Sequence, residues 1–426
     1  MSKIVGVRGI EILDSRGRPT VRAFCELEGG ALGIASAPSG ASTGAAEALE
    51  LRDGDPQRYG GFGCRRAVEN VGGTMNEALT GRSFDSQEDL DRAMVELDGT
   101  DNKSRLGANA ILAVSLAFAR AVASEGDVPL YRHFADLLGR TPDALPRPTI
   151  NLFSGGKHAG GQVAIQDALV VPLVAKTMDE ALATTYQVYQ SAVKLGLEKY
   201  GARPLTADEG GLAPPFPDAA AMLGDAVEAI KIAGYEPGRD VALALDVASS
   251  HFYEKGRYHL GDEPLDGGDM IEHVSAWLDR YPIVSVEDGL SENDWENWPR
   301  LRERLSGRVL TLGDDLLCTD PDRIRRAVST GAADALLLKV NQVGTLTEAA
   351  EALRVARNAG WVVTVSARSG ETEDDWLADL AVGWGGDQVK IGSITQSERL
   401  AKYNRLLEIE TETGLPLAER PAGIPG

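Results

Sequence analysis

Short apolar runs, each followed by an amphipathic stretch, recur from Pro146 onward and constrain the fold more than any other feature of the sequence. Strand-like runs that alternate with helical stretches are typical of βα units around a parallel sheet. We therefore predict an α/β fold with a barrel of βα units over residues 140–420. The runs are VALALD, PIVSVED, VLTLGDD, ALLLKV, VVTVSA and QVKIG.

The residues before the barrel follow a different pattern. Short apolar strands with glycine-bearing turns are predicted around Val5–Leu13, Thr20–Leu27 and Ala31–Ala35, and helical periodicity begins at about Ala45. This change of period predicts an α+β cap domain over residues 1–135.

Composition and charge exclude several classes of function. The chain has 43 basic and 64 acidic residues and a net charge of −21, which argues against a nucleic acid or an anionic membrane as partner. The apolar segment Gly107–Glu125 has helical spacing and is predicted to be a buried helix, not a membrane span. Three cysteines without a CxxC pair exclude a disulfide scaffold and a thiolate zinc site. We expect a cytoplasmic protein that acts on a small anionic molecule.

Three of the predicted strands end in an acidic residue, namely Asp246, Glu287 and Asp314. The carboxyl ends of barrel strands meet at one mouth, so these carboxylates are expected to lie together. Their repulsion would be offset by a cation, and oxygen ligands favour Mg²⁺. A solvated position or a local salt bridge would explain any one of these acids alone, but not three at corresponding positions.

Two further strands end in lysine, at Lys339 and Lys390. A buried lysine near a metal can have its pKa lowered enough to act as a base. Together with Mg²⁺, such a base can abstract a proton beside a carboxylate and stabilise the enediolate that forms. For either lysine alone, a side chain that extends from the strand end to solvent is the simpler explanation.

Two glycine-rich loops are candidates for ligand contact. PSGASTG, at Pro38–Gly44, can present backbone amides and the hydroxyl of Ser42 to a phosphate or a metal, although it lacks the GKS or GKT of a P-loop. GGKHAGG, at Gly155–Gly161, holds His158 between glycines that permit close approach of a ligand. A structural role for this histidine stays open.

The chain resembles the enolase family over nearly its whole length. The resemblance implies a modified (β/α)8 TIM barrel with an N-terminal α+β cap and two Mg²⁺ ions per active site. The motifs that carry it are LDSRGRPTV, PSGASTG, ALELRDGD, NKSRLGANAIL, ADEGGLAP, ALDVASS, LLLKVNQVGTL, SARSGETED and SERLAKYN.

The resemblance also implies roles for individual residues. Lys339 matches the base that works at carbon-2, and Glu209 matches the acid that assists departure of the carbon-3 hydroxyl. The remaining matched positions hold metal or substrate: Asp246, Glu287 and Asp314 at the first Mg²⁺, Ser42 near the second, Arg368 and Ser369 at the phosphate, Lys390 at the substrate and His158 in a mobile loop.

The departures from the family pattern lie at the same site. Ala367 replaces an active-site histidine, and Asp167 shortens the glutamate of the usual QEF to the QDA found here. Lys157 stands where a serine usually precedes the loop histidine, Gly289 replaces a proline, and Gln396 takes the position of an arginine. We count Asp167 and Lys157 among the substrate-binding candidates. Because the metal ligands and the base are kept while the groups that handle the hydroxyl differ, an altered reaction is expected.

Three hypotheses for the function follow from this comparison. In the first, phosphoenolpyruvate reacts with a phosphonate instead of water, as in a carboxyphosphonoenolpyruvate synthase of phosphonate biosynthesis. In the second, the chain is an ordinary phosphopyruvate hydratase, a lyase that interconverts 2-phosphoglycerate and phosphoenolpyruvate. In the third, it is a non-catalytic protein with an enolase fold, although retention of the metal ligands and lysines argues against this.

The resemblance also predicts a homodimer. Family dimers pair a glutamate with an arginine across the interface, and the matching positions here are Arg22 and Glu408. The two charges are exchanged between the positions, so that the pairing is preserved.

Overall fold

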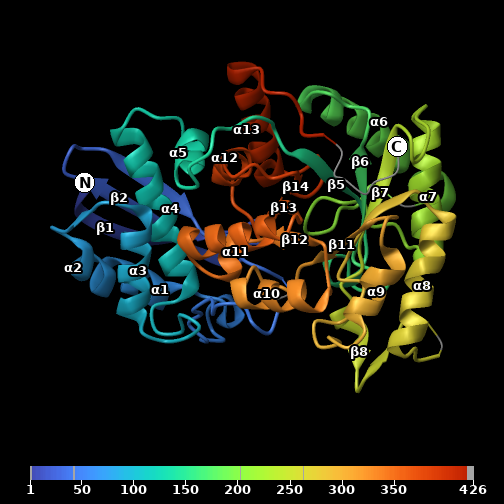
Figure 1. Ribbon diagram of the computed structural model, residues 1–426, viewed down its shortest axis with the longest axis horizontal. Helices are drawn as coiled ribbons and strands as arrows, with labels where there is room; N and C mark the ends of the chain where they lie inside the picture. Colours follow the sequence, from blue (N-terminus) through green and yellow to red (C-terminus); the bar gives the residue numbers. More distant parts are fainter. Residues whose placement is uncertain (1, 42–43, 202, 262, 420–426) are drawn as a thin grey trace.

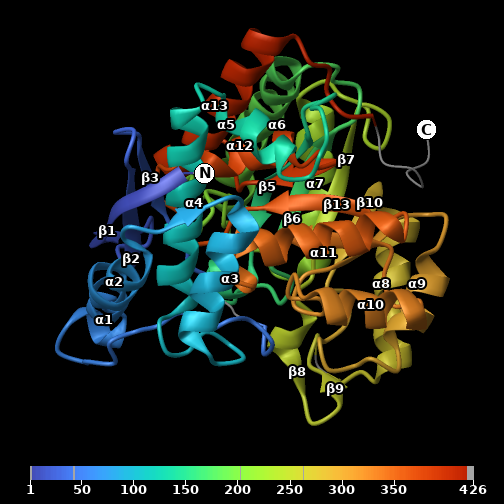
Figure 2. The same cartoon turned by 60° about the vertical axis from the view of Figure 1, so that its left-hand side comes forward.

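The computed structural model describes residues 2–41, 44–201, 203–261 and 263–419. A four-stranded sheet with helices forms one part of the molecule, and a closed eight-stranded barrel forms the other (Figure 1). Figure 2 shows the two parts meeting where α3 (Gln87–Asp98) lies beside α11 (Leu346–Asn358). The predicted α/β fold, a TIM barrel with an N-terminal α+β cap, is confirmed.

The sheet of the cap has the strand order β3-β2-β1-β4, with antiparallel pairing throughout. Its elements are β1 (Ser2–Leu13), β2 (Pro19–Leu27), β3 (Leu32–Ser36), α1 (Arg65–Asn70), α2 (Asn76–Leu79), β4 (Ser83–Phe84), α3, α4 (Ala108–Glu125) and α5 (Leu130–Asp136).

The expected helical structure from Ala45 is wrong. Residues 45–58 contain no helix, and α1 begins at Arg65. Gly54 adopts a positive φ of 72°, and Pro56 interrupts the helical hydrogen-bond pattern. This segment instead carries side chains that contact arginines near the barrel mouth.

Helix α4 is the central helix of the cap. Most of its side chains are buried, and it packs against β2 and β3. Among the described residues it is the one helix that meets the length and hydropathy of a membrane span, yet 78% of that window is buried inside the protein. It is therefore a core helix, as predicted.

The barrel closes in the order β10-β11-β12-β13-β14-β5-β6-β7. Its strands are β5 (Arg147–Ser154), β6 (Asp167–Pro172), β7 (Val241–Asp246), β10 (Ile283–Glu287), β11 (Leu310–Gly313), β12 (Ala335–Leu338), β13 (Val362–Ser366) and β14 (Gln388–Lys390). Its helices are α6 (Met178–Tyr200), α7 (Ala219–Ile232), α8 (Gly267–Arg280), α9 (Trp298–Leu305), α10 (Pro321–Thr330), α11, α12 (Trp376–Gly383) and α13 (Ser397–Thr413). A short hairpin, β8 (Tyr253–Glu254) and β9 (Arg257–Tyr258), projects from one side.

The first two strands of the barrel, β5 and β6, are absent from the predicted runs. They pair antiparallel with each other, and β6 also pairs antiparallel with β7, whereas the other barrel pairs are parallel. A hairpin connection without an α-helix breaks the alternating pattern that identified the other strands.

Side-chain caps fix where several helices begin. A serine, threonine or aspartate accepts a hydrogen bond from a backbone N–H of the first turn, which satisfies a donor without a helical partner. The caps are Ser86, Thr177, Asp218, Asp266, Asp320 and Thr345.

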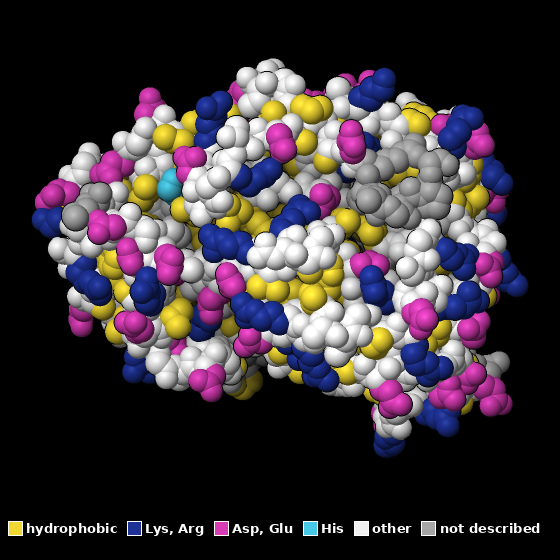
Figure 3. Space-filling view, viewed as in Figure 1, with side chains coloured by type: hydrophobic (Ala, Val, Ile, Leu, Met, Phe, Trp, Pro, Cys, Tyr) yellow, Lys and Arg dark blue, Asp and Glu magenta, His cyan; other side chains and the backbone are white. Residues whose placement is uncertain are grey.

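On the face shown in Figure 3, acidic and basic side chains are interspersed, so this face has no continuous basic surface for nucleic acid.

Candidate active site

The register of the barrel brings two of the predicted carboxylates together. Asp246 and Glu287 end neighbouring strands and are direct register partners. The Nζ of Lys390, at the end of β14, lies 2.8 Å from Oδ2 of Asp246 and 2.7 Å from Oε2 of Glu287. All three side chains are buried, so a single ammonium group bridges two carboxylates at the mouth.

The third predicted carboxylate pairs with the other lysine. Asp314 follows β11 and forms an ion pair through Oδ2 with Nζ of Lys339, which follows β12. Nε2 of Gln342 donates to the other oxygen, Oδ1, at 2.9 Å. Gln342 lies in the helical turn Val340–Gln342 directly after the strand. The strand ends therefore converge as the sequence predicts.

Crowding of the carboxylates shifts their pKa values in opposite directions. Burial raises the pKa of Glu287 well above its usual range, and the negative charge of Asp246 adds to this. Burial also disfavours ionised Asp246, but the charge and hydrogen bond of Lys390 outweigh it and lower the pKa of Asp246 to about 2. When no cation is bound, Glu287 is therefore held uncharged while Asp246 stays ionised.

A buried set of carboxylate oxygens fits Mg²⁺, which prefers such hard ligands, and the charge of the ion would offset the repulsion between Asp246 and Glu287. Asp246, Glu287 and Asp314 would hold the ion. Bound Mg²⁺ would stabilise the negative charge of a carboxylate substrate and of an enediolate derived from it. Ser42, the predicted ligand near a second ion, lies outside the described residues.

Direct ion pairs raise the pKa values of both lysines when no metal is bound, so a pKa lowered by a nearby metal stays a prediction. Burial lowers the pKa of Lys339, but the charge of Asp314 outweighs it, and the pKa is raised. Asp246 and Glu287 outweigh burial in the same way and raise the pKa of Lys390 well above its usual range.

The closest groups of possible metal ligands differ from the predicted one. Ligand atoms of Asp288, Asp314 and Asp315 all lie within 4.8 Å of one another. The carboxylate of Asp288 accepts hydrogen bonds from the backbone N–H groups of Asp314 and Asp315, at 3.0 and 2.8 Å. Asp288 therefore holds the backbone that carries Asp314.

A second close group contains His158, Asp167 and Glu209. Nδ1 of His158 lies 3.1 Å from Oδ2 of Asp167, and its Nε2 lies 3.9 Å from Oε1 of Glu209. Ser154 donates to Asp167 at 2.5 Å, and Asn151 donates to Glu209 at 3.0 Å. Asp167 begins β6 and is in register with the metal-site strand β7, so this group adjoins the carboxylates described above.

The histidine and the carboxylates of this group stabilise each other's charged forms. Burial would lower the pKa of His158, but Glu209 and Asp167 outweigh it and raise the pKa to about 9. Burial would raise the pKa of Glu209, yet the positive charges of His158 and of Arg399 lower it. The pair is therefore best described as an imidazolium beside an ionised Glu209, which in this state can accept a proton but not donate one.

This arrangement predicts a pH-dependent stability. The pKa of His158 is raised from 6.5 to about 9, so its stabilising charge is fully present below pH 6.5 and is lost as the pH rises through 9. From pH 6.5 to 9.5 we expect the wild type to lose up to about 3 kcal/mol more unfolding free energy than His158→Gln, by urea unfolding. Equal losses in both proteins would contradict the assignment; His259→Gln, at an exposed histidine, is the control.

The predicted phosphate-holding residues lie across the mouth, after β13. Arg368 is buried and forms an ion pair with Glu47 of the cap, with NH1 and Oε2 3.0 Å apart. The hydroxyl of Ser369 accepts hydrogen bonds from the backbone N–H of Ala41 at 2.7 Å and from Arg16 at 3.3 Å. The cap loop therefore contacts the barrel directly at this side of the site.

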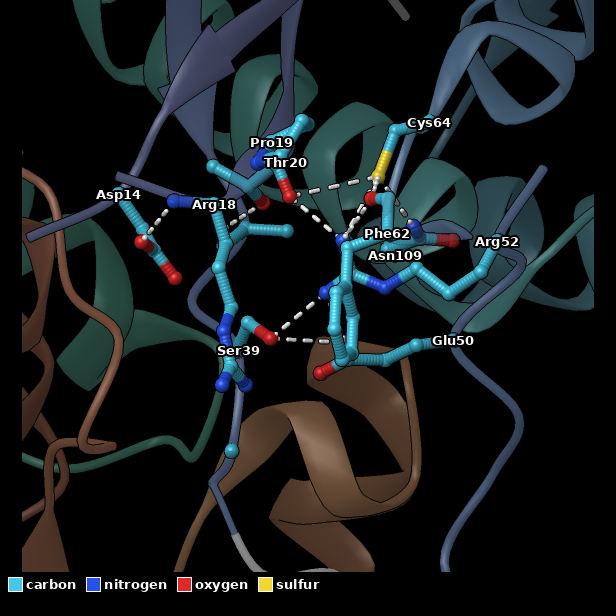
Figure 4. Close-up of polar contacts among 12 residues, drawn as sticks. Asp14, Arg18, Pro19, Thr20, Ser39, Glu50, Arg52, Phe62, Cys64 and Asn109 are labelled. Atoms are coloured by element: carbon cyan, nitrogen blue, oxygen red, sulfur yellow. Dashed lines mark hydrogen bonds and ion pairs between the residues drawn. The ribbon is translucent and has the colours of Figure 1, made fainter. Parts of the chain in front are cut away.

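An arginine-centred network in the cap supports that loop (Figure 4). Arg52 donates to the hydroxyl of Ser39 at 2.7 Å and to the carboxylate of Glu50 at 2.6 Å. It also donates to the carbonyls of Pro19 and Phe62, at 2.5 and 2.9 Å. Backbone hydrogen bonds between Ser39 and Gly370, at 2.8 and 2.9 Å, carry this support across to the barrel.

The predicted site residues that the structure describes are thus brought to one mouth, although Lys157 lacks the polar contacts of the others. Lys157, in the helical turn Gly156–His158 (η3), is exposed and has no hydrogen bond or ion pair among the described residues. Several contacts to the predicted residues come from side chains outside the predicted set, namely Glu47, Gln342, Asn151 and Ser154. Polar residues next to glycine-rich motifs or after strand ends were the available signal.

Comparison with known families agrees with this geometry. The family described as enolase, N-terminal domain, matches residues 4–134, and the family described as enolase, C-terminal TIM barrel domain, matches residues 142–418. Together the two matches cover nearly the whole chain, including every described residue of the site. The chain therefore belongs to the enolase family.

Proposed function

We propose that this protein is a specialised Mg²⁺-dependent enolase-family enzyme that combines phosphoenolpyruvate with a phosphonate, in the manner of a carboxyphosphonoenolpyruvate synthase. The proposal rests on one combination. The acidic and lysine residues of the family site are all present, whereas several residues around them differ from the family pattern. Asp246, Glu287 and Asp314 are buried beside the two lysines. A protein that had lost all catalytic function would have no reason to keep these costly buried charges.

The most informative of these differences, Ala367, lies directly beside the retained Lys390. Ala367 follows β13, is buried, and its N–H donates to the carbonyl of Lys390 at 2.8 Å. A methyl group at this position can neither donate nor accept the proton of a departing hydroxyl, and it occupies less space than an imidazole. This supports a reaction with a larger nucleophile than water.

The proposed reaction balances without an oxidant or reductant. Lys339 gives a proton to carbon-3 of phosphoenolpyruvate while an oxygen of the phosphonate forms a bond to carbon-2. Lys339 then removes a proton from carbon-3, the bond between carbon-2 and the phosphate oxygen breaks, and phosphate leaves with the electron pair. Arg368 and Ser369 are the candidates to bind that phosphate, and Lys390 to orient the carboxylate.

Replacing Ala367 with histidine separates this proposal from ordinary hydratase activity. We expect little dehydration of 2-phosphoglycerate by the wild type, and about a 10²-fold gain or more in Ala367→His, because a proton-handling group contributes 10²- to 10⁴-fold. Formation of phosphoenolpyruvate is followed by absorbance, and release of phosphate from phosphoenolpyruvate plus phosphonoformate is followed in parallel.

Ala367→Phe, which adds bulk without a titratable nitrogen, is the matched control. Rapid dehydration by the wild type, with no phosphate released in the presence of phosphonoformate, would show an ordinary hydratase. Absence of both reactions, with Mg²⁺-dependent binding also absent, would favour a non-catalytic protein.

We also propose that the protein is a homodimer. Arg22 lies on β2, where its Nε donates to the hydroxyl of Ser36, and Glu408 lies on α13 with an exposed side chain held by Arg405 at 3.0 Å. Both residues are therefore available to a partner at their outer ends.

Light scattering at micromolar concentration should give the mass of a dimer, and Glu408→Arg should shift it toward monomer, with Glu412→Arg as a control on the same helix. A wild-type monomer would contradict the proposal.

A further inference from the structure

One corner of the barrel mouth contains polar atoms that the proposed chemistry so far leaves unused. His251 lies in the short helical turn Ser249–Phe252 (η4), directly after β7. Both nitrogens of its ring are buried, and neither has a hydrogen-bond partner. Burial and the positive charge of Lys157 lower the pKa of His251 to about 4, so the ring is neutral at pH 7 with one donor and one acceptor. Buried polar atoms without partners are costly and require an explanation.

Two other side chains of this corner are also available to a ligand. Lys157 has no ion-pair partner among the described residues, and its charge is the largest that acts on His251. Gln166 is buried and donates through Nε2 to Asp246 at 3.1 Å, but its Oε1 has no partner. The backbone of Gln166 packs against the turn that carries Lys157, since its carbonyl accepts from the N–H of Gly155 at 2.7 Å.

The order of the barrel strands places this corner away from the predicted phosphate position. Arg368 and Ser369 follow β13, whereas His251 follows β7. These two strands are separated by β14, β5 and β6 on one side and by β12, β11 and β10 on the other, so they lie opposite each other. Positive groups therefore stand at two opposite edges of the mouth, with the carboxylate site between them.

We propose that Lys157, Gln166 and His251 form the binding site for the second substrate, an oxyanion of the phosphonate class. Lys157 supplies the positive charge and His251 a neutral N–H donor. Gln166 accepts a hydrogen bond from a protonated oxygen of the same group. This inference rests on the proposed two-substrate reaction and adds to it the residues that select the nucleophile.

The test uses variants that remove the polar atoms and keep the volume. His251→Phe and Lys157→Met are compared with Lys255→Met and His259→Phe, which change exposed residues of the neighbouring segment. With Mg²⁺ and phosphoenolpyruvate present, the affinity for phosphonoformate is measured by calorimetry. We expect each site variant to weaken it by about 10- to 100-fold, the range for a charge-assisted hydrogen bond. Affinity for phosphoenolpyruvate alone should change less than twofold.

Stability provides a second readout. His251→Phe removes two unsatisfied buried nitrogens, so its melting temperature without ligand should equal or exceed that of the wild type. A loss of phosphoenolpyruvate affinity as large as the loss of phosphonoformate affinity would overturn the assignment, as would unchanged binding of both. Inorganic phosphate that binds as tightly as phosphonoformate would show a general anion site and overturn the assignment to a phosphonate.

The outcomes keep the two proposals apart. If phosphonoformate binds in a manner that depends on Lys157 and His251 but yields no product, the site stands and the reaction fails. If product forms at the wild-type rate in both variants, the reaction stands and the site fails.

Discussion

Replacing Lys339 with arginine is expected to reduce turnover by about 10²- to 10⁴-fold, because the reaction needs a group that both gives up and takes back a proton. Arginine keeps the positive charge beside Asp314 but does not deprotonate in proteins. The variant therefore tests proton transfer without removing the ion pair. The rate is measured on the reaction that the wild type catalyses, whether phosphate release or dehydration.

Lys339→Met measures how much the ion pair with Asp314 contributes to stability. Removal of the ammonium leaves a buried carboxylate unpaired, which costs about 3 to 5 kcal/mol of unfolding free energy when measured in a chelator. Mg²⁺ should restore part of that stability, because it would replace the lost positive charge. Retention of more than a tenth of the wild-type rate by Lys339→Arg would show that another residue moves the proton.

The strand ends could be predicted from the sequence because the barrel topology fixes where they go. Asp246, Glu287, Asp314, Lys339 and Lys390 are far apart in the chain, yet each follows a recognisable apolar run, and parallel strands bring their ends to one mouth. The site could be predicted although its residues are far apart in the sequence, because the recurring βα pattern locates the end of each strand.

Other parts of the molecule depend on contacts between segments and could not be predicted in this way. Strands β5 and β6 form a hairpin, so the connection between them lacks the α-helix that marks a βα unit. The segment after Ala45 has helical spacing, but Glu47 contacts Arg368 of the barrel instead of forming a helical face. The partners of a side chain in another domain leave no local pattern in the sequence.

The pKa of a buried group is a further property that the sequence does not determine. Burial alone would lower the pKa of Lys339, whereas the neighbouring Asp314 reverses the direction. Similarly, His251 lies in a turn whose sequence indicates no function, and only the packing shows that its nitrogens lack partners. Such groups become visible when every buried polar atom is assigned a partner.

Glu287→Gln and Asp246→Asn are expected to change the unfolding free energy in a chelator by very different amounts, although the two carboxylates share Lys390. Burial and the charge of Asp246 raise the pKa of Glu287, so a neutral amide at position 287 resembles the state that the site already favours. Its unfolding free energy should stay within about 1 kcal/mol of the wild type. Asp246 has a pKa lowered to about 2, and its loss should cost about 3 to 5 kcal/mol.

Magnesium should reveal what the two carboxylates have in common. At 100 times its dissociation constant, Mg²⁺ should stabilise the wild type by about 2.7 kcal/mol, and neither variant should show more than a small part of this gain. Turnover should be lost in both variants and in the chelated wild type, whose fold persists because the lysines partly neutralise the carboxylates. Glu303→Gln, at an exposed position of α9, is the control. Full Mg²⁺ stabilisation of Glu287→Gln would remove Glu287 from the ligand set and would direct attention to the group formed by Asp288, Asp314 and Asp315.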